Sequence, residues 1–393
     1  MINILLILQY AALFWIGVPL CIFGIYGTII LYYNRSRRKE SQNVQEPGET
    51  PFEPLLSIVV PTHNESSIIS KRIENLLAVD YPADKLEILF VDDSNDSTAA
   101  LIEDYSKRYT NVHLMHFNER MGYSPCLIAG CKAAKGEIVV LAEASSLFEP
   151  ETVPALVRNF RDPSIGAVTG KAMLLNTNEE MGKSENLYQR IYNFVRTGES
   201  NMDSTIYMKG EAAAVRKSLL TDIETIAKCP GTADTGIGIF ARSKGYKFVF
   251  DPKVKFYEYA ASTNEERVKQ KTIRGANLIK VLFFFKSMFF KRKYGKFGMI
   301  TLPFNLAMLA FVPISILIGF GFLVLLTILE PGSLVFFWVI LATVFVGIFA
   351  ISRHLMVTFF QFEFSLLKAF YEIVFVRKSH DKIDKAASTR RGE

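Results

Sequence analysis

The sequence predicts an α/β domain with a Rossmann-like, mostly parallel sheet, joined to an α-helical transmembrane region. No charged side chain occurs over Met1–Asn34, Phe297–Leu329 or Pro331–Ser352, and about 20 apolar residues suffice to cross a bilayer core. Between the first two stretches, over about residues 40–290, lies a charged block in which strand and helix patterns alternate. Because 50% of the residues are hydrophobic and 21% are charged, disordered and collagen-like classes are excluded.

Basic residues gather at the edges of the apolar stretches. They follow the first stretch, precede the second and crowd the C-terminus: Arg35, Arg37, Arg38, Lys39; Lys286, Lys291, Arg292, Lys293, Lys296; Arg377, Lys378, Lys382, Lys385, Arg390, Arg391. The positive-inside rule explains this pattern without a nucleic-acid partner. It predicts an integral, multi-pass protein of the cell membrane with its N-terminus outside and the charged block in the cytoplasm. The oligomeric state stays open.

These patterns divide the chain into six segments. They are an N-terminal transmembrane anchor (1–34), a basic and polar linker (35–54), the α/β domain (55–275), an interfacial amphipathic helix (276–296), two transmembrane helices (297–352), and an interfacial helix with a basic cytoplasmic tail (353–393). The first stretch lacks a basic n-region and a small-residue cleavage site, which favours a retained anchor over a signal peptide. A buried helix of the domain is the alternative for Leu278–Phe290, and a further span is the alternative for Leu355–Val376.

Strand and helix patterns alternate after the linker. Short apolar runs, typical of strands buried on both faces, lie over Leu55–Pro61, Leu86–Val91, Val112–His116 and Glu137–Leu141. Helical spacing lies over Glu65–Leu77, Thr98–Tyr109 and Ser124–Ala134, and later a helix over Ile237–Lys244 precedes a strand over Tyr246–Phe250. In open parallel sheets, ligands bind at the carboxyl ends of the strands, where the strand order reverses.

Acidic residues stand at those strand ends. Asp92 and Asp93 close one strand, where they could accept hydrogen bonds from the hydroxyl and imide N–H groups of a nucleoside. Glu143 and Ser145 end a later strand, where a carboxylate and a hydroxyl could hold a divalent ion that bridges phosphates. A turn with a helix cap is the alternative for Asp96–Thr98, and a capped strand end is the alternative for the later pair.

Asp234 stands just before a predicted helix. It could act as a general base that takes a proton from an acceptor hydroxyl, or it could be an N-cap. The Gly236-x-Gly238-x-x-Ala241 string matches a dinucleotide fingerprint but follows no predicted strand, so dinucleotide binding is not favoured. A basic cluster further on could stabilise a leaving diphosphate or attract the membrane surface: Arg267, Lys269, Gln270, Lys271 and Arg274.

Taken in order over about residues 55–275, these motifs resemble the membrane-integrated, inverting family 2 glycosyltransferases of GT-A fold. Ser57–Glu65 (SIVVPTHNE) resembles the family's opening strand with its Pro-x-x-Asn-Glu end beside the nucleotide. Val91–Thr98 (VDDSNDST) resembles the nucleoside-binding Asp-Asp motif. Gly166–Gly170 and Lys209–Glu211 are similar to the segments on the sugar and acceptor sides.

The later motifs continue the resemblance. Glu143-Ala144-Ser145 stands where the metal-binding Asp-x-Asp lies in the family. Thr232-Ala233-Asp234 is similar to the Thr-Glu-Asp that supplies the catalytic base. Pro252 and Glu258 fall where the family has a Pro and a Glu, and Gln270–Arg274 falls where it has Gln-x-x-Arg-Trp.

The resemblance implies a set of site residues and ligands. The residues are Asp234 for catalysis; Pro61, Thr62, Asn64, Glu65, Asp92, Asp93 and Arg120 for the nucleotide; Glu143 and Ser145 for a metal; and Lys171, Gly210, Glu211, Gln270 and Arg274 for the diphosphate or acceptor. It implies Mg²⁺ or Mn²⁺ as cofactor and a nucleotide-sugar donor, a UDP-sugar in particular. The implied acceptor is lipid-linked or a membrane-proximal glycan, and membrane lipids are further partners.

Three departures from the family pattern shape the prediction. The Asp-x-Asp reads Glu-Ala-Ser, the family's Gly-Lys reads Gly122-Tyr123, and Gln270–Arg274 (QKTIR) lacks the Trp and places the Arg one residue late. In processive polysaccharide synthases the last motif holds the terminal sugar, so we predict transfer of a single sugar or a short extension. A processive synthase of hyaluronan or cellulose type is one alternative, and a non-catalytic nucleotide-sugar-binding membrane scaffold is another. A transporter is not favoured, because the spans carry almost no polar side chain beyond Asn305.

Overall fold

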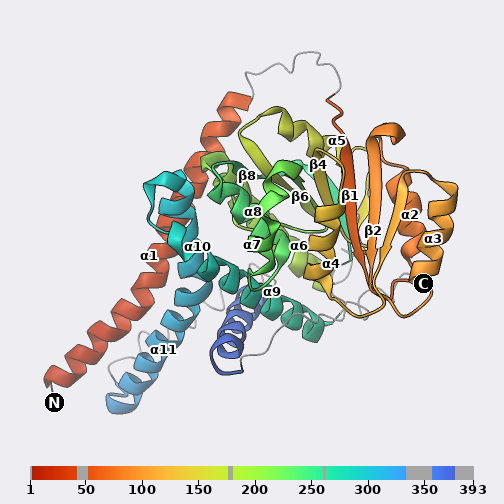
Figure 1. The fold of residues 1–393 in the computed structure, drawn as a ribbon. Coiled ribbons are helices and arrows are strands. Elements are labelled where there is room, and N and C mark those ends of the chain that lie inside the picture. Colours follow the sequence, from red (N-terminus) through yellow and green to blue (C-terminus); the bar gives the residue numbers. More distant parts are fainter. Residues whose placement is uncertain (1, 42–51, 176–179, 260–262, 333–355, 377–393) are drawn as a thin grey trace.

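The computed structural model of the chain describes residues 2–41, 52–175, 180–259, 263–332 and 356–376. A sheet covered by helices forms one part of the molecule, and two long apolar helices project from one side of it (Figure 1). Most of the predicted span Pro331–Ser352 and all of the predicted basic tail from residue 377 lie outside the described residues.

Strands and helices alternate along most of the domain. The strands are β1 (Leu56–Thr62), β2 (Leu86–Asp92), β3 (Val112–His116), β4 (Ile138–Ala142), β5 (Leu147–Phe148), β6 (Ile165–Leu174), β7 (Ala212–Arg216) and β8 (Lys247–Glu258). The helices are α1 (Ile2–Ser41), α2 (Ile69–Leu77), α3 (Thr98–Arg108), α4 (Tyr123–Ala133), α5 (Thr152–Val157), α6 (Glu180–Met202), α7 (Ile223–Ala227), α8 (Ala233–Ser243), α9 (Asn264–Phe284), α10 (Leu302–Leu306) and α11 (Val312–Leu329).

The described part of the chain contributes eight strands to one sheet, in the order β3-β2-β1-β4-β7-β6-β8-β5. β1 pairs in parallel with β2 and β4, β2 with β3, and β6 with β8. β7 is antiparallel to both of its neighbours, and β5 is antiparallel to β8. The predicted α/β fold with a mostly parallel sheet is therefore confirmed.

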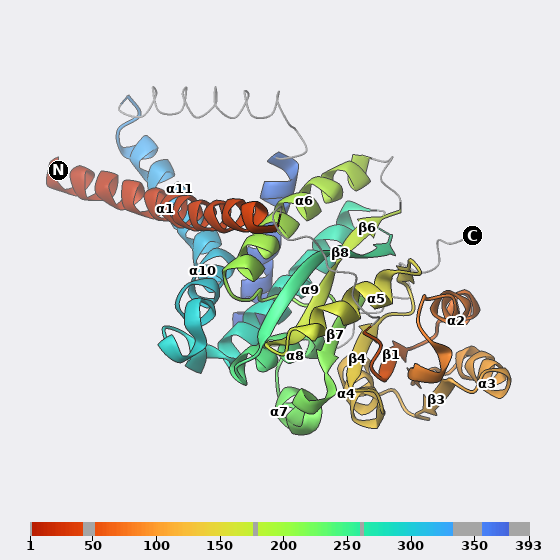
Figure 2. The ribbon, with the colours of Figure 1, turned by 90° about the horizontal axis from the view of Figure 1, so that it is seen from above.

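Two hydrophobic cores lie on opposite faces of this sheet. Ile58 and Val60 of β1 face a core that α2, α3 and α5 complete, whereas Val59 faces a core that α4, α8 and α9 complete. Alternate residues of a strand point to opposite faces, so a strand covered on both sides needs a continuous apolar run. α2 and α3 lie at the end of the sheet farthest from α1 and α11, as both ribbon views show (Figures 1 and 2).

Parts of the fold differ from the sequence pattern. α2 begins at Ile69 rather than Glu65, because Asn64 has a left-handed backbone (φ 54°) and a single turn follows it. α6, which the pattern did not predict, buries the polar side chains of Gln189 and Glu199 on its inner side. A helix without an apolar stripe gives no periodic signal.

The predicted interfacial helix over 276–296 overlaps the last part of α9. α9 is one helix that begins at Asn264, and Leu278 and Val281 in its last turns belong to the core of the domain. Short 3₁₀ turns follow over Lys286–Met288 and Arg292–Tyr294. Leu278 and Val281 pack as the alternative of a buried domain helix expects, whereas Phe283 and Phe290 are exposed. Whether this segment lies at a membrane surface stays a prediction.

The described residues include two helices that are long and apolar enough to cross a membrane, Ile4–Ser36 and Phe297–Leu329. Only 11% of the first apolar window is buried within the structure. α1 and α11 lie side by side, and Ser315 Oγ donates a hydrogen bond to the carbonyl of Trp15 (2.8 Å). This exposed apolar surface indicates that the chain associates with a membrane. The predicted linker begins as helix, because α1 continues to Ser41.

The last described segment is helical over residues 356–371 and packs against α9. Gln361 accepts a hydrogen bond from Arg267 Nη1 (2.7 Å), and Leu366 and Ala369 are buried beside Gly275. The side of the predicted interfacial helix that carries these residues therefore packs against α9. Its orientation relative to a bilayer stays a prediction.

We expect Gly136→Ala to destabilise the domain. A Cβ there would lie 2.6 Å from the carbonyl carbon of Leu56, and the Gly136 N–H donates to Ser57 Oγ (2.8 Å), so the backbone cannot retreat without losing a hydrogen bond. Overpacking of this kind costs about 2 kcal/mol of unfolding free energy, or about 5 °C in Tm, measured by thermal unfolding in detergent. Gly17→Ala, whose Cβ would meet nothing within 4 Å, is the control. Equal Tm values for the two variants would contradict this prediction.

Candidate active site

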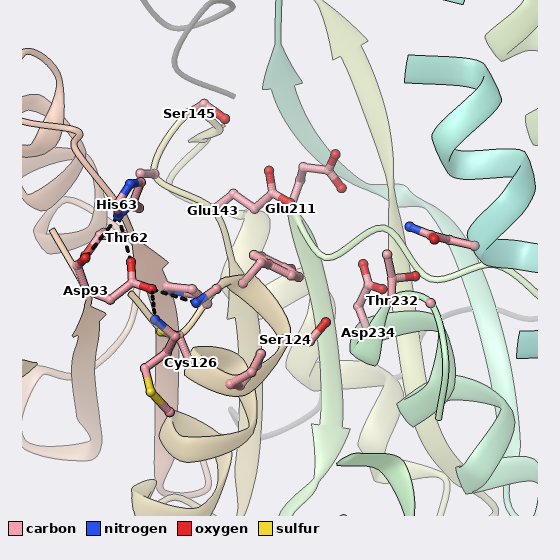
Figure 3. Close-up of a pocket in the computed structure, with 18 of the residues that line it drawn as sticks. Thr62, His63, Asp93, Ser124, Cys126, Glu143, Ser145, Glu211, Thr232 and Asp234 are labelled. Atoms are coloured by element: carbon pink, nitrogen blue, oxygen red, sulfur yellow. Dashed lines mark hydrogen bonds and ion pairs between the residues drawn. The ribbon is translucent and has the colours of Figure 1, made fainter. Parts of the chain in front are cut away.

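A cavity of about 230 Å³ lies at the carboxyl ends of β1, β2 and β4. The strand order reverses there, because the chain passes from β1 to β2 and β3 on one side before it returns to β4 on the other. Ligands of open α/β sheets bind outside such a reversal. The loops after these strands, the segment before β7 and parts of α4, α8 and α9 line the cavity (Figure 3).

Asp93 at the end of β2 fixes the loop that leads into α4. Its Oδ2 accepts hydrogen bonds from the backbone N–H groups of Met121 (2.8 Å) and Gly122 (2.7 Å). Its Oδ1 lies 2.9 Å from Nδ1 of His63 and 3.4 Å from Nη1 of Arg120. Gly122 has a φ of 94°, a left-handed conformation that favours glycine. The predicted residues Asp93 and Arg120 thus line the cavity together with His63.

Asp92 lies beneath the cavity and does not line it. Its side chain is fully buried, accepts hydrogen bonds from Thr62 Oγ1 (2.7 Å) and Ser94 Oγ (2.6 Å), and lies 2.9 Å from His116 Nδ1. Asp93, the next residue, does line the cavity, so the two adjacent side chains point to different sides of the chain. Asp92 instead accepts a hydrogen bond from Thr62, which does line the cavity, and a direct contact of Asp92 with a nucleotide stays a prediction.

The loop after β4 carries Glu143 and Ser145 to the cavity, and Glu143 is largely buried. Ser146 Oγ lies 3.1 Å from the carbonyl oxygens of both Glu143 and Glu211, so it joins this loop to the residue before β7. Glu211 also lines the cavity. Figure 3 shows the two glutamates toward the middle of the site.

Arg72 lies under this loop, and sequence reasoning missed it. Its side chain is only 1% exposed, and its guanidinium donates to Asn75 Oδ1 (2.7 Å) and Ser146 Oγ (3.2 Å). Its Cζ also lies 4.4 Å from the ring centroid of Phe148. Burial lowers the pKa of Arg72 to about 9, and the negative charge of Glu143 opposes that shift. A buried cation thus supports the loop that carries Glu143.

Asp234 lies in the first turn of α8. The helix begins at Ala233 rather than at Ile237, and Thr232 is the residue in the N-cap position, so the N-cap interpretation of Asp234 is wrong. Asp234 Oδ1 accepts a hydrogen bond from the backbone N–H of Thr235 (2.7 Å). A carboxylate in the first turn is stabilised in its ionised form by the helix dipole.

Gly210 brings its backbone against Asp234. Its N–H donates to Asp234 Oδ2 (3.1 Å), and a Cβ at Gly210 would lie 2.7 Å from that oxygen and 2.5 Å from the hydroxyl of Tyr123. The close approach of this backbone to the side chains of Asp234 and Tyr123 requires glycine at position 210. Burial raises the pKa of Tyr123 well above its ordinary value, and the charges of Asp234, Glu143 and Glu211 raise it further. The phenol is therefore protonated and lies among the acids of the cavity.

α9 brings Arg274 to the cavity, where its Nη2 lies 3.5 Å from Oε1 of Glu211. Gln270, one turn earlier on the same helix, does not line it. Of the two predicted residues Gln270 and Arg274, the structure thus places Arg274 at the cavity.

Other predicted residues also lie outside the lining. Asn64 accepts a hydrogen bond from the backbone N–H of Asn95 (3.1 Å) and so joins the loops after β1 and β2. Lys171 stands beside Lys255 where β6 pairs with β8. Gly210 acts through its backbone N–H, as described above. The predicted residues Pro61, Thr62, Glu65 and Ser145 line the cavity.

The described residues contain no group of three or more His, Cys, Asp or Glu side chains that could hold a metal ion. Glu143 and Ser145 offer one carboxylate and one hydroxyl at the cavity. This donor set fits a hard divalent ion that takes its remaining ligands from substrate phosphates and water.

Several lining residues were not singled out from the sequence. His63 stands inside the Pro-x-x-Asn-Glu string, but a histidine there has no pattern of its own. Tyr207 lies in the irregular segment between α6 and β7, where no periodicity marks it. Cys126 comes from a predicted helix, and Asn277 comes from the segment predicted as an interfacial helix, and neither pattern indicates a ligand.

The fold and the acidic cavity at the strand reversal define a glycosyltransferase of the GT-A class. The model of the family described as "Glycosyltransferase like family 2" matches residues 54–276, and the chain belongs to that family. The predicted family and the enzyme class are therefore confirmed.

Two curated relatives are named poly-β-1,6-N-acetyl-D-glucosamine synthase. The one from Staphylococcus aureus (strain COL) is 24% identical over 277 residues, which cover 69% of this chain and 66% of the synthase. The one from Staphylococcus epidermidis is 25% identical over 210 residues, which cover 51% of this chain and 49% of the synthase. The chain thus spans between about half and two thirds of the length of these relatives.

Among solved structures, the chain is similar to the mannosyltransferase PcManGT from Pyrobaculum calidifontis in complex with GDP-Man and Mn²⁺. The two are 22% identical and superpose with a TM-score of 0.72, over 94% of this chain and 100% of the other. At this identity the likeness shows a shared fold.

Proposed function

We propose that the protein is a membrane-bound, inverting glycosyltransferase. It moves a sugar from a nucleotide-sugar donor, a UDP-sugar in particular, to a lipid-linked or membrane-proximal glycan acceptor. The observation that carries the proposal is one cavity lined by Asp93 at the end of β2, Glu143 after β4 and Asp234 at the start of α8. Asp93 suits a nucleoside, Glu143 a diphosphate and Asp234 an acceptor, and Figure 3 shows the three side chains in this order across the site.

The donor side of the site would rest on the ends of β1 and β2. Asp93, Thr62 and Arg120 are proposed to hold the nucleoside, with Pro61 and Glu65 beside it. Asp92 and Asn64 would support these loops from below. Pro61 and Thr62 end β1, and Asp93 directly follows β2, so this part of the assignment lies at the carboxyl ends of two paired strands.

The diphosphate would lie between Glu143, Ser145 and Arg274. A divalent ion, Mg²⁺ or Mn²⁺, would supply charge neutralisation at the leaving diphosphate when bound there. The Mn²⁺ in the mannosyltransferase complex supports this choice of cofactor. Glu143 and Ser145 would hold the ion, and the guanidinium of Arg274 would attract the developing negative charge.

Asp234 is proposed as the general base. As the acceptor hydroxyl oxygen bonds to the anomeric carbon, its proton passes to a carboxylate oxygen of Asp234, and the bond from that carbon to the diphosphate breaks. The electron pair of that bond leaves with the nucleoside diphosphate. Attack from the face opposite the diphosphate inverts the anomeric configuration. A lipid phosphate acceptor arrives already ionised, and Asp234 would then orient it.

A processive polysaccharide synthase is the second candidate. The names of the staphylococcal relatives favour it, because both are synthases of a sugar polymer. The divergent QKTIR segment and the placement of Gln270 outside the cavity favour single transfer. Product length separates the two candidates.

A donor panel tests the proposed function. The full chain in nanodiscs with native lipid extract is offered UDP-glucose, UDP-N-acetylglucosamine, UDP-glucuronate and GDP-mannose, with and without Mn²⁺. We expect release of UDP from one UDP-sugar, at a rate that depends on Mn²⁺, together with a lipid-extractable product one sugar heavier by mass spectrometry. Polymer of many sugars would establish the processive alternative. Nucleotide-sugar binding without release or transfer across the panel would establish a non-catalytic scaffold.

A further inference from the structure

A buried carboxylate joins the two apolar helices to the catalytic domain. Glu199 of α6 is 1% exposed. Its Oε1 accepts hydrogen bonds from the hydroxyl of Tyr26 in α1 (2.6 Å) and from Nδ2 of Asn305 in α10 (2.7 Å), and its Oε2 accepts one from Thr205 Oγ1 (2.7 Å). Helices that are far apart in the sequence therefore meet at one side chain.

This carboxylate is costly to bury. Burial raises the pKa of Glu199, whereas the hydrogen bonds from Tyr26, Asn305 and Thr205 and the charge of Arg196 lower it. Arg196, one turn earlier on α6, is itself 1% exposed, and its Cζ lies 4.1 Å from the ring centroid of Phe250. Apolar side chains of similar volume commonly give equal or greater stability at such a position. A contribution to stability alone therefore does not explain why a carboxylate is buried at position 199.

The segment Asp203–Glu211, here called the strap, runs from this junction to the cavity. At its first residue, Asp203 Oδ2 accepts a hydrogen bond from the backbone N–H of Phe297, where the second apolar helix begins (3.1 Å). Two residues later, Thr205 binds Glu199. The Tyr207 carbonyl accepts a hydrogen bond from Arg196 Nη2 (3.2 Å). The membrane end of the strap is thus held by α6 and the apolar helices.

The cavity end of the strap is held by the catalytic domain. The backbone N–H of Lys209 donates to Thr169 Oγ1 (3.0 Å), and that of Gly210 donates to Asp234 Oδ2 (3.1 Å). Tyr207 and Glu211 line the cavity from this segment. The strap therefore connects the start of the second apolar helix with the proposed base through consecutive, mostly buried residues.

We propose that Glu199 is a positioning residue that sets the strap against the apolar helices and thereby orients Tyr207 and Glu211 for the acceptor. The inference rests on the proposed function of the cavity. Thr62 ends β1 and Asp93 directly follows β2, and their hydrogen bonds and ion pairs among the described residues go to other parts of the domain. A substitution at Glu199 should therefore lower the efficiency of transfer to the acceptor and leave the affinity for the nucleotide unchanged.

Glu199→Gln and Tyr26→Phe test the proposal in the full chain in nanodiscs. We expect each variant to lower kcat/KM for the acceptor by about tenfold, while the Kd of UDP, measured by calorimetry, stays within about twofold of wild type. The double variant should lose less than the product of the two single losses, because both changes break one contact. Glu103→Gln, the same substitution at an exposed position of α3, is the control.

Hydrogen exchange gives a second readout that does not need an acceptor. The amides of Lys209 and Gly210 should exchange at least about tenfold faster in Glu199→Gln than in wild type, while those of β1 and β4 stay unchanged. Unchanged strap exchange would overturn the proposal whatever the activity. Wild-type acceptor kinetics in both variants, or a loss of UDP affinity equal to the loss of transfer, would overturn it as well. If the wild-type chain shows no transfer, the proposed function is refuted. The hydrogen-exchange result then decides by itself whether Glu199 sets the position of the strap.

Discussion

Asp234→Asn should lower the rate of transfer to a hydroxyl acceptor by about 10³-fold, within the range that a positioned general base contributes. Asparagine keeps the size of the side chain, and its carbonyl oxygen can accept one of the two hydrogen bonds that the carboxylate accepts from the N–H groups of Gly210 and Thr235. It cannot take a proton from an acceptor. The Kd of UDP should therefore stay within about twofold of wild type, and the loss should appear in kcat rather than in KM.

Asp222→Asn is the matched control. Asp222 is an exposed acid that pairs with Lys244 (2.6 Å), so its loss removes one carboxylate without touching the cavity. We expect its rate to equal that of wild type. Wild-type transfer by Asp234→Asn with a hydroxyl acceptor would refute the base assignment. A loss of less than about tenfold with a lipid phosphate, beside a large loss with a hydroxyl, would identify Asp234 as an orienting group for an ionised acceptor.

The strands near the nucleotide side could be predicted because they are buried on both faces. Leu55–Pro61 carries apolar residues at nearly every position, and β1 occupies almost the same residues. Since the carboxyl ends of parallel strands share an edge, the convergence of Asp93 and Glu143 also follows from the sequence alone. Which of the two adjacent acids lines the cavity does not follow from the sequence, because the side-chain direction of Asp92 depends on the pleat of β2.

The remaining parts could not be predicted because their signals are not local. α6 buries Arg196 and Glu199 where a helix pattern calls for apolar residues, and the partners that make this tolerable, such as Tyr26, stand far away in the sequence. The start of α8 was placed too late because Gly236 and Gly238 lower helix propensity. The structure explains Gly238, whose Cβ would lie 2.5 Å from Cε1 of the Phe248 ring.

Glu143→Gln should lower the affinity of the enzyme for Mn²⁺ more than any change elsewhere in the cavity. Glu143 is the carboxylate of the proposed metal pair, and an amide oxygen is a neutral and poorer ligand for a hard cation. We expect transfer to fall by about 100-fold at low Mn²⁺ and to recover in part at high Mn²⁺. Electron paramagnetic resonance of Mn²⁺ in the presence of UDP should show a matching loss of bound ion, which is a readout independent of turnover.

Arg72→Met tests the residue that supports the Glu143 loop separately from the carboxylate that is proposed to hold the metal ion. The buried guanidinium bonds Ser146, which joins the Glu143 loop to Glu211, so its loss should free the loop while leaving the carboxylate in place. Supporting residues of this kind change metal affinity by about 10–100-fold. Arg216→Met is the control, since that guanidinium donates to backbone carbonyls such as that of Ile165 (2.7 Å), at the far end of β6 from the cavity. If Arg72→Met bound Mn²⁺ as wild type does while Glu143→Gln did not, the Glu143 loop would hold its shape without the Arg72 guanidinium. If both variants kept wild-type Mn²⁺ binding, the ion would not reside at Glu143.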